Sequence, residues 1–116
     1  MEKVGLYIER FNELTGQSIP CGNIYQSAGL SVHVIKRHPE CAADIGIIPQ
    51  IIAEPDYIGH SPTEPQSIEL VKRLQNNMMV CIKLDVKKNY LYVASLFSIS
   101  EAKIQNRLNS GRPVKF

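Results

Sequence analysis

The chain has 116 residues, a length that suits one domain burying roughly two thirds of its unfolded surface. Apolar residues make up 44% and charged residues 21%, which excludes intrinsic disorder, and no apolar run approaches the ~20 residues of a membrane span. The net charge of +2 hides an asymmetry, since residues 1–66 hold four Lys/Arg against eight Asp/Glu and residues 67–116 hold nine against three. These balances are −4 and +6, so the second part has the sign that attracts a polyanion.

The first third of the chain predicts short elements. Residues 4–8 begin either a strand or a helix, and residues 9–14 predict a helix that ends at Gly16. A short strand is expected at residues 24–26. A helix over about residues 30–37 follows, and Pro39 terminates it, because the residue before a proline is driven out of helical geometry.

The middle of the chain is rich in helix breakers. Residues 42–53 predict a helix interrupted near Gly46 and Pro49. A turn is expected at residues 54–57, and the Pro-rich stretch 60–66 predicts an exposed loop.

From residue 67 onward, apolar residues alternate with polar ones, which is the period of a β-strand. Strands are expected at residues 68–74, 78–84 and 90–99, with a hairpin turn at 87–89. In the third strand the alternation places Ser95 on the same face as Leu91, Val93 and Phe97. Ser100 has the character of an N-cap, so a final helix is expected from there to about residue 109.

The chain lacks the common sequence motifs of nucleotide binding and metal binding. The chain contains neither a Walker loop nor a G-x-G-x-x-G pattern. Cys21, Cys41 and Cys81 are widely spaced and form no C-x-x-C pair, which favours free buried thiols over a zinc or redox site. Met1–Gly5 lacks the basic start and apolar core of a signal peptide, so we expect synthesis in the cytoplasm, or delivery into a target cell by a larger phage or toxin system.

Six short stretches resemble a known family when they are taken together and in order. They are Ile24–Leu30, His33–His38, Pro55–Gly59, Ser67–Lys72, Tyr90–Ser95 and Ser110–Arg112. Over about residues 22–112 the chain resembles the phage-associated branch of the barnase–EndoU–colicin–RelE-like nucleases. The resemblance implies an α+β fold, in which N-terminal helices pack on a C-terminal antiparallel meander of about four strands closed by a C-terminal helix. We expect a single nuclease-like domain over residues 1–116, with residues 1–21 either in the core or as an N-terminal extension.

The implied activity is an endoribonuclease that uses no metal and no other cofactor. In this chemistry the 2′-hydroxyl attacks the adjacent phosphorus, which requires a base, an acid and cations around the phosphate. On a helix starting near residue 30, His33, Lys36 and Arg37 fall within one stripe that could meet a phosphate. The resemblance adds His38 as a second acid or base, and Ser95 as a hydrogen-bond donor to the scissile phosphate.

Further residues are candidates for holding the substrate. They are Tyr57, Lys83, Arg107 and Arg112, in addition to Lys36. An Arg can hold a phosphate with two parallel hydrogen bonds. For each of these positions an ordinary solvated or packed side chain is the alternative, and for Ser95 the alternative is a buried hydroxyl.

We therefore expect an endoribonuclease of the phage or toxin type that acts on RNA, tRNA among the possible targets. An inhibitor or immunity protein, or a phage head protein, is the expected protein partner. The alternatives are a non-catalytic RNA- or protein-binding module and an assembly domain of a phage particle, both on the same fold. The modest net charge of +2 keeps both alternatives open, since many nucleic-acid-binding proteins are far more basic.

Overall fold

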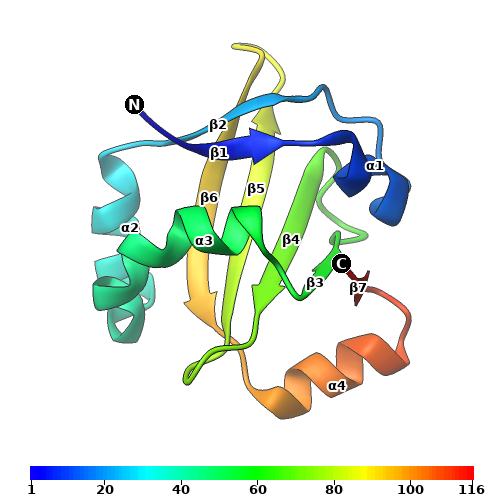
Figure 1. Cartoon of the computed structure of the whole chain (residues 1–116). Coiled ribbons are helices and arrows are strands. Elements are labelled where there is room, and N and C mark those ends of the chain that lie inside the picture. Colours follow the sequence, from blue (N-terminus) through cyan, green and yellow to red (C-terminus); the bar gives the residue numbers. More distant parts are fainter.

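A seven-stranded sheet organises the chain in the computed structural model, which describes residues 1–116 (Figure 1). The strands are β1 (Glu2–Tyr7), β2 (Gly22–Gln26), β3 (Tyr57–Gly59), β4 (Ser67–Lys72), β5 (Met78–Asp85), β6 (Tyr90–Ser98) and β7 (Val114–Lys115). Their order across the sheet is β1-β2-β6-β5-β4-β3-β7. The helices are α1 (Glu9–Thr15), α2 (Gly29–Arg37), the 3-10 helix η1 (Pro39–Ile47), α3 (Ile48–Ala53) and α4 (Glu101–Asn109).

The α+β class is confirmed, but the expected sheet of about four antiparallel strands is wrong in size and type. The antiparallel β4–β5–β6 meander is present, and β2 pairs with β6 in parallel, so the sheet is mixed. At the far side, β3 pairs with both β4 and β7. Strands of three and two residues are too short to show an alternating pattern, and the turn expected at residues 54–57 gives way at Tyr57 to β3.

Residues 1–21 form part of the sheet and of its apolar core. β1 pairs antiparallel with β2, and the side chains of Tyr7 and Phe11 are almost completely buried. The buried Asn12 side chain accepts a hydrogen bond from the Tyr7 hydroxyl at 2.7 Å and donates one to the carbonyl of Ile19 at 2.8 Å. Because its polar atoms are paired, Asn12 can be buried at little cost. Residues 1–21 therefore contribute both a strand and buried side chains to the fold.

The helix expected over residues 42–53 is instead a 3-10 helix followed by a short α-helix. Pro39 stands at the start of η1 and Pro49 at the start of α3. A proline lacks an amide hydrogen, which the first turn of a helix does not need, so each proline begins a segment here rather than interrupting one. Ile48, Ile51 and Ile52 then bury one side of α3 against the sheet.

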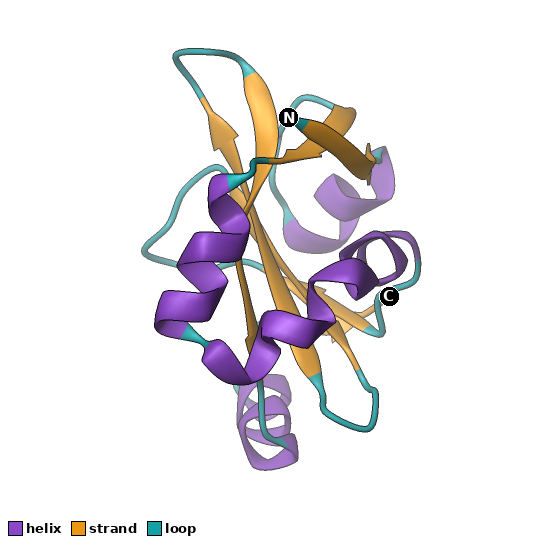
Figure 2. Ribbon diagram, turned by 90° about the vertical axis from the view of Figure 1, so that its left-hand side faces the viewer, coloured by secondary structure: helices purple, strands orange, loops and turns teal.

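The two faces of the sheet are covered very differently. The core face, which bears Leu70, Val80 and Ile82, lies under α1, α2, η1 and α3 in a cluster of 20 buried residues. On the opposite face, Val71 and Met79 join Ile104 of α4 in a second cluster of only 4 buried residues. Figures 1 and 2 both show α4 at one end of the sheet, so much of this second face, termed the open face below, is left uncovered by helices.

Candidate active site

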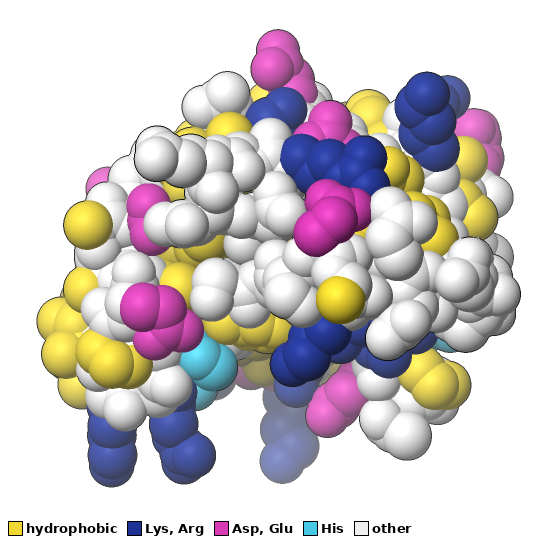
Figure 3. Space-filling view, turned by 90° about the horizontal axis from the view of Figure 1, so that it is seen from below, with side chains coloured by type: hydrophobic (Ala, Val, Ile, Leu, Met, Phe, Trp, Pro, Cys, Tyr) yellow, Lys and Arg dark blue, Asp and Glu magenta, His cyan; other side chains and the backbone are white.

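A polar groove lies on the open face beside α2 and encloses about 660 Å³. Its walls come from α2, from strands β4 to β6 and from the loop before β4. The residues that line the groove are His33, Arg37, His38, Ser61, Thr63, Glu64, Glu69, Cys81, Lys83, Ala94 and Ser95. Seen from below, a histidine lies in a hollow with Lys and Arg side chains on either side (Figure 3). A groove so rich in titratable and cationic groups is suited to acid–base chemistry on an anion.

Helix α2 brings His33 and Arg37 to the groove because it packs beside the edge of β6. Within β6, only Leu91 and Tyr92 pair with β2, which leaves the remainder of β6 without a strand on that side. Val34 is completely buried and fixes the helix against the core, whereas His33 and Arg37 are exposed. Adjacent residues of α2 thus have different roles: Val34 packs in the core, and His33 lines the groove.

Ser95 reaches the groove through a β-bulge in β6. Cys81 pairs with Ser95 and Ile82 pairs with Val93, so Ala94 is an extra residue without a partner on β5. A bulge re-aims the side chains that follow it, and it turns Ser95 onto the open face and Leu96 into the core. The sequence-based placement of Ser95 on the face of Val93 is therefore wrong. In the structure Ser95 Oγ lies 3.4 Å from Nε2 of His33.

His38 enters the groove from the junction of α2 and η1. Its backbone amide donates to the carbonyl of Val34 at 2.7 Å, closing the last turn of α2 before Pro39. Its ring stands 5.3 Å from the ring of Phe97 and 6.3 Å from the ring of His33, measured between centroids. The two imidazoles are thus close neighbours on one side of the groove.

Lys83 supplies a positive charge from β5. Its Nζ lies 3.2 Å from Oε2 of Glu64, a residue of the loop before β4. Both side chains are substantially exposed, so this ion pair contributes at most about 1 kcal/mol and can yield to an anionic ligand. Ser61 and Thr63 of the same loop add hydroxyl groups to this wall.

Glu69 of β4 is the residue that sequence reasoning missed. Its side chain is only 13% exposed, and its Oε1 accepts from Arg112 at 2.8 Å and lies 3.5 Å from Arg107. Nothing local in the sequence of β4 indicates that α4 and the segment after it bring two arginines to Glu69. The only signal is that Glu69 is one of three acidic residues in the basic second part.

Cys81 lies in the groove floor as a neutral thiol. Its pKa is raised to about 12, first by burial and then by the charge of Glu69, and the charges of Lys83, Arg107 and Arg112 oppose this increase. A thiol held in its protonated form is a poor nucleophile. The floor of the groove therefore offers packing rather than covalent chemistry.

The structure brings five of the nine predicted site residues to the groove, namely His33, Arg37, His38, Lys83 and Ser95. Four do not line it. Lys36 is exposed on α2 beside the stripe of His33 and Arg37, and Tyr57 packs in the cluster under α4, where the guanidinium of Arg73 lies 5.0 Å from its ring centre. Arg107 and Arg112 bind Glu69 instead, so they reach the groove only through that carboxylate.

Two further structural observations concern the whole chain. No three His, Cys, Asp or Glu side chains gather in a way that could hold a metal ion. None of the helices has the length and the apolar character that a membrane crossing requires.

The groove combines two imidazoles, a hydroxyl and several cations beside the sheet of an α+β fold, and these groups suit the proton transfers and charge stabilisation of a nuclease. The chain belongs to the family described as phage-Barnase-EndoU-ColicinE5/D-RelE like nuclease3, which it matches over residues 2–106. This family is one of phage nucleases, as the sequence motifs indicated, and the match begins in β1, earlier than those motifs. No curated protein and no solved structure matches the chain.

Proposed function

We propose that this nuclease is an endoribonuclease that cleaves RNA by attack of a 2′-hydroxyl on the adjacent phosphorus. The observation that carries the proposal is the pair of imidazoles, His33 and His38, standing 6.3 Å apart beside Ser95, Arg37 and Lys83 in one groove. Imidazole is the side chain best suited to exchange protons near neutral pH. Two of them on one wall can serve the two proton transfers that this reaction requires.

Each step of the reaction has a candidate group. One imidazole removes the proton of the 2′-hydroxyl as its oxygen bonds to phosphorus, and the other gives a proton to the 5′-oxygen as the P–O5′ bond breaks. The products are a 2′,3′-cyclic phosphate and a 5′-hydroxyl. Arg37 and Lys83 stabilise the negative charge that accumulates on the phosphate oxygens. Ser95, 3.4 Å from His33 Nε2, holds that ring in orientation.

In this proposal, Glu69 holds the floor of the groove in place. Its carboxylate draws Arg107 and Arg112 together behind the groove and offsets one of their two positive charges. Arg37 and Lys83 are then the cations closest to a bound phosphate, since both line the groove directly.

The test is gel-based cleavage of total RNA and tRNA in buffer with EDTA. The wild-type protein is expected to cut RNA, and His33→Ala is expected to lose the activity. A strand with a single ribonucleotide in DNA should be cut only after that nucleotide, because DNA lacks the attacking hydroxyl. Intact RNA with wild type, or cutting of all-DNA strands, would overturn the proposal, and salt-dependent RNA binding without cleavage would select the binding-module alternative.

A further inference from the structure

Three tyrosines form an aromatic stripe on the open face that the proposed reaction does not use. Tyr25 pairs with Tyr92 in the parallel β2–β6 ladder, and Tyr90 lies two positions before Tyr92 on β6. The ring centres of Tyr25 and Tyr90 are 6.5 Å apart, and those of Tyr90 and Tyr92 are 5.8 Å apart. All three side chains are half-buried, so each keeps part of its ring accessible.

The stripe continues directly from the groove. Tyr92 is the register partner of Lys83, which lines the groove, and neighbours across a ladder point to the same face. Three positions along β6 separate Tyr92 from Ser95, about 10 Å at the rise of a strand. A nucleic-acid strand whose phosphate lies at Lys83 therefore reaches the stripe with its next bases.

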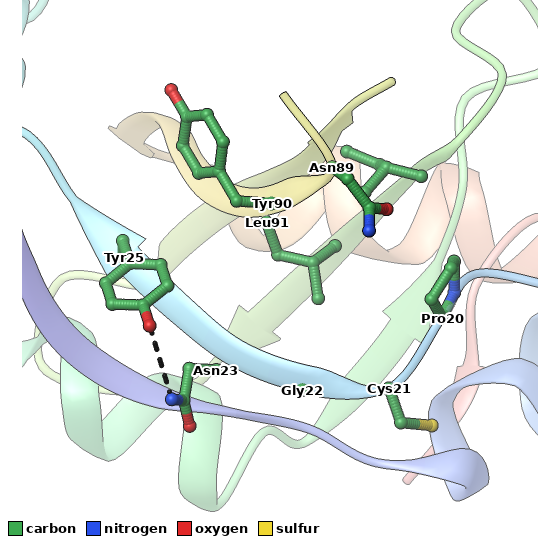
Figure 4. Close-up of a pocket in the computed structure, with 9 residues that line it drawn as sticks. Pro20, Cys21, Gly22, Asn23, Tyr25, Asn89, Tyr90 and Leu91 are labelled. Carbon is green, nitrogen blue, oxygen red and sulfur yellow. Dashed lines mark hydrogen bonds between the residues drawn. The ribbon is translucent and has the colours of Figure 1, made fainter. Parts of the chain in front are cut away.

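A small pocket opens where β2 and β6 diverge beside these rings. It encloses about 280 Å³, just below the lower end of the range for drug-sized ligands, which suits one nucleobase. Figure 4 shows Tyr25 and Tyr90 on the two strands that border this pocket, with Leu91 between the strands and Asn89 farther along, away from both tyrosine rings. Asn23 donates from Nδ2 to the Tyr25 hydroxyl at 3.3 Å, which holds that side chain in place (Figure 4).

The charge around the stripe suits a polyanion. Lys87 and Lys88 occupy the exposed turn just before Tyr90, and Lys3 pairs with Tyr25 across β1 and β2. The nearest acid across the ladder is Asp85, opposite Tyr90, and its carboxylate accepts the backbone amide of Lys88 at 3.0 Å. Aromatic rings beside lysines form the pattern that binds single strands by stacking and by phosphate contacts.

We infer that Tyr25, Tyr90 and Tyr92 form a stacking subsite for the bases of single-stranded RNA that flank the cleaved bond. This inference rests on the proposed ribonuclease function and adds a preference for unpaired RNA, because bases inside a duplex cannot reach the rings. Tyr90 is central, since it contacts both other rings and borders the pocket. The amides of Asn23 and Asn89 at the pocket wall are placed to bond the edge of the base that enters.

Tyrosine fluorescence gives a direct readout, because the chain has five tyrosines and no tryptophan. The probe is a 2′-O-methyl RNA strand of about 12 nucleotides, which matches sites of this kind and cannot be cleaved. Wild type should bind it with quenched emission, and Tyr90→Leu should raise Kd about 10-fold and lose most of the quenching. Tyr90→Phe, which keeps the ring, should stay within about 2-fold of wild type.

Three results would overturn the inference: no binding of the strand by wild type, equal binding by Tyr90→Leu, or equal binding of the same strand in a duplex. A circular-dichroism melt shows whether Tyr90→Leu is folded, and Tyr92→Leu repeats the test at a second ring. For cleavable RNA, the subsite predicts a raised KM with unchanged kcat in Tyr90→Leu. Failure of the ribonuclease proposal would give a different result: RNA would stay intact, and the 2′-O-methyl strand would still quench the emission of the wild-type protein.

Discussion

The two faces of the sheet divide the tasks of the molecule. The core face is apolar and covered by four helical segments. Val80 and Leu96 of the sheet and Val34 of α2, which packs on it, are completely buried. The open face carries Lys83, Ser95 and the groove, with α4 packed over only one end. Burial of apolar area drives folding, while an accessible polar surface is required for chemistry on a large substrate. Stability and activity should therefore respond to different substitutions, even at adjacent residues.

The largest expected effect comes from His33 and its neighbour Val34. His33→Ala should lower RNA cleavage by about 100-fold or more, the usual contribution of a general acid or base. Because His33 is exposed, the same change should leave the melting temperature nearly unaltered. Val34→Ala should do the reverse and cost roughly 2 kcal/mol of unfolding free energy, with normal activity per folded molecule. Cleavage kinetics and urea unfolding of both variants check this prediction. An unstable but active His33→Ala would contradict the separation of activity from stability.

The bulge at Ala94 is followed by a second pair of adjacent residues with different roles, Ser95 on the open face and Leu96 on the core face. Leu96→Ala should destabilise the fold by about 2–5 kcal/mol, since the side chain is completely buried. Ser95→Ala should leave stability within about 0.5 kcal/mol and reduce kcat by about 5- to 10-fold, the worth of one hydrogen bond to His33. Ser95→Thr keeps the hydroxyl and serves as the matched control. If Ser95→Ala were instead the destabilising variant, Ser95 would lie on the core face after all.

Glu69 sharpens the comparison because it lies on the open face and yet supports the structure. Glu69→Gln removes the charge that pairs with Arg107 and Arg112 and leaves two cations less well compensated. We expect a loss of about 1–3 kcal/mol in urea unfolding, less than for a fully buried pair because both arginines are partly exposed. Glu64→Gln, at the exposed pair with Lys83, is the control and should change stability by less than about 1 kcal/mol. Equal effects of the two substitutions would contradict the structural role of Glu69.

Cys81 gives a small effect on stability that depends on pH. Its pKa is about 12 in the folded chain, chiefly because of burial, and lies above the ordinary thiol value of 9.0, so folding favours the protonated thiol. This contribution is complete below the unfolded pKa and is lost as pH rises from there toward the folded pKa. Between about pH 8 and 10.5, wild type should lose about 1–2 kcal/mol more than Cys81→Ala, which cannot titrate. Equal losses of unfolding free energy in the two proteins between these pH values would contradict a raised pKa of Cys81 in the folded chain.

Sequence alone predicted the parts of the fold that local patterns determine. Alternation predicted the β4–β5–β6 meander, and Pro39 and Ser100 predicted the end of α2 and the start of α4. It did not predict β3 and β7, because strands of three and two residues form only where a partner strand is already in place. The parallel β2–β6 pairing depends equally on contacts between residues far apart in the sequence.

The candidate site was predictable where one helix carries it and not where the tertiary fold assembles it. The helical spacing of His33 and Arg37 placed both on one stripe, which the structure directs at the groove. No periodicity reveals an extra residue such as Ala94, so Ser95 was assigned to the wrong face. The pairing of Glu69 with Arg112, 43 positions away, is likewise a property of the folded chain alone.

Backbone NMR of the isotope-labelled protein with a 2′-O-methyl RNA strand tests the central claim most directly, because it maps the bound RNA on the two faces at once. We predict that the amide signals of Arg37, Lys83 and Ser95 shift as the strand is added, whereas those of Val80 and Ile52 on the core side stay in place. Shifts confined to the core side or to β1, or no shifts at any residue, would show that the groove is not where this nuclease meets RNA.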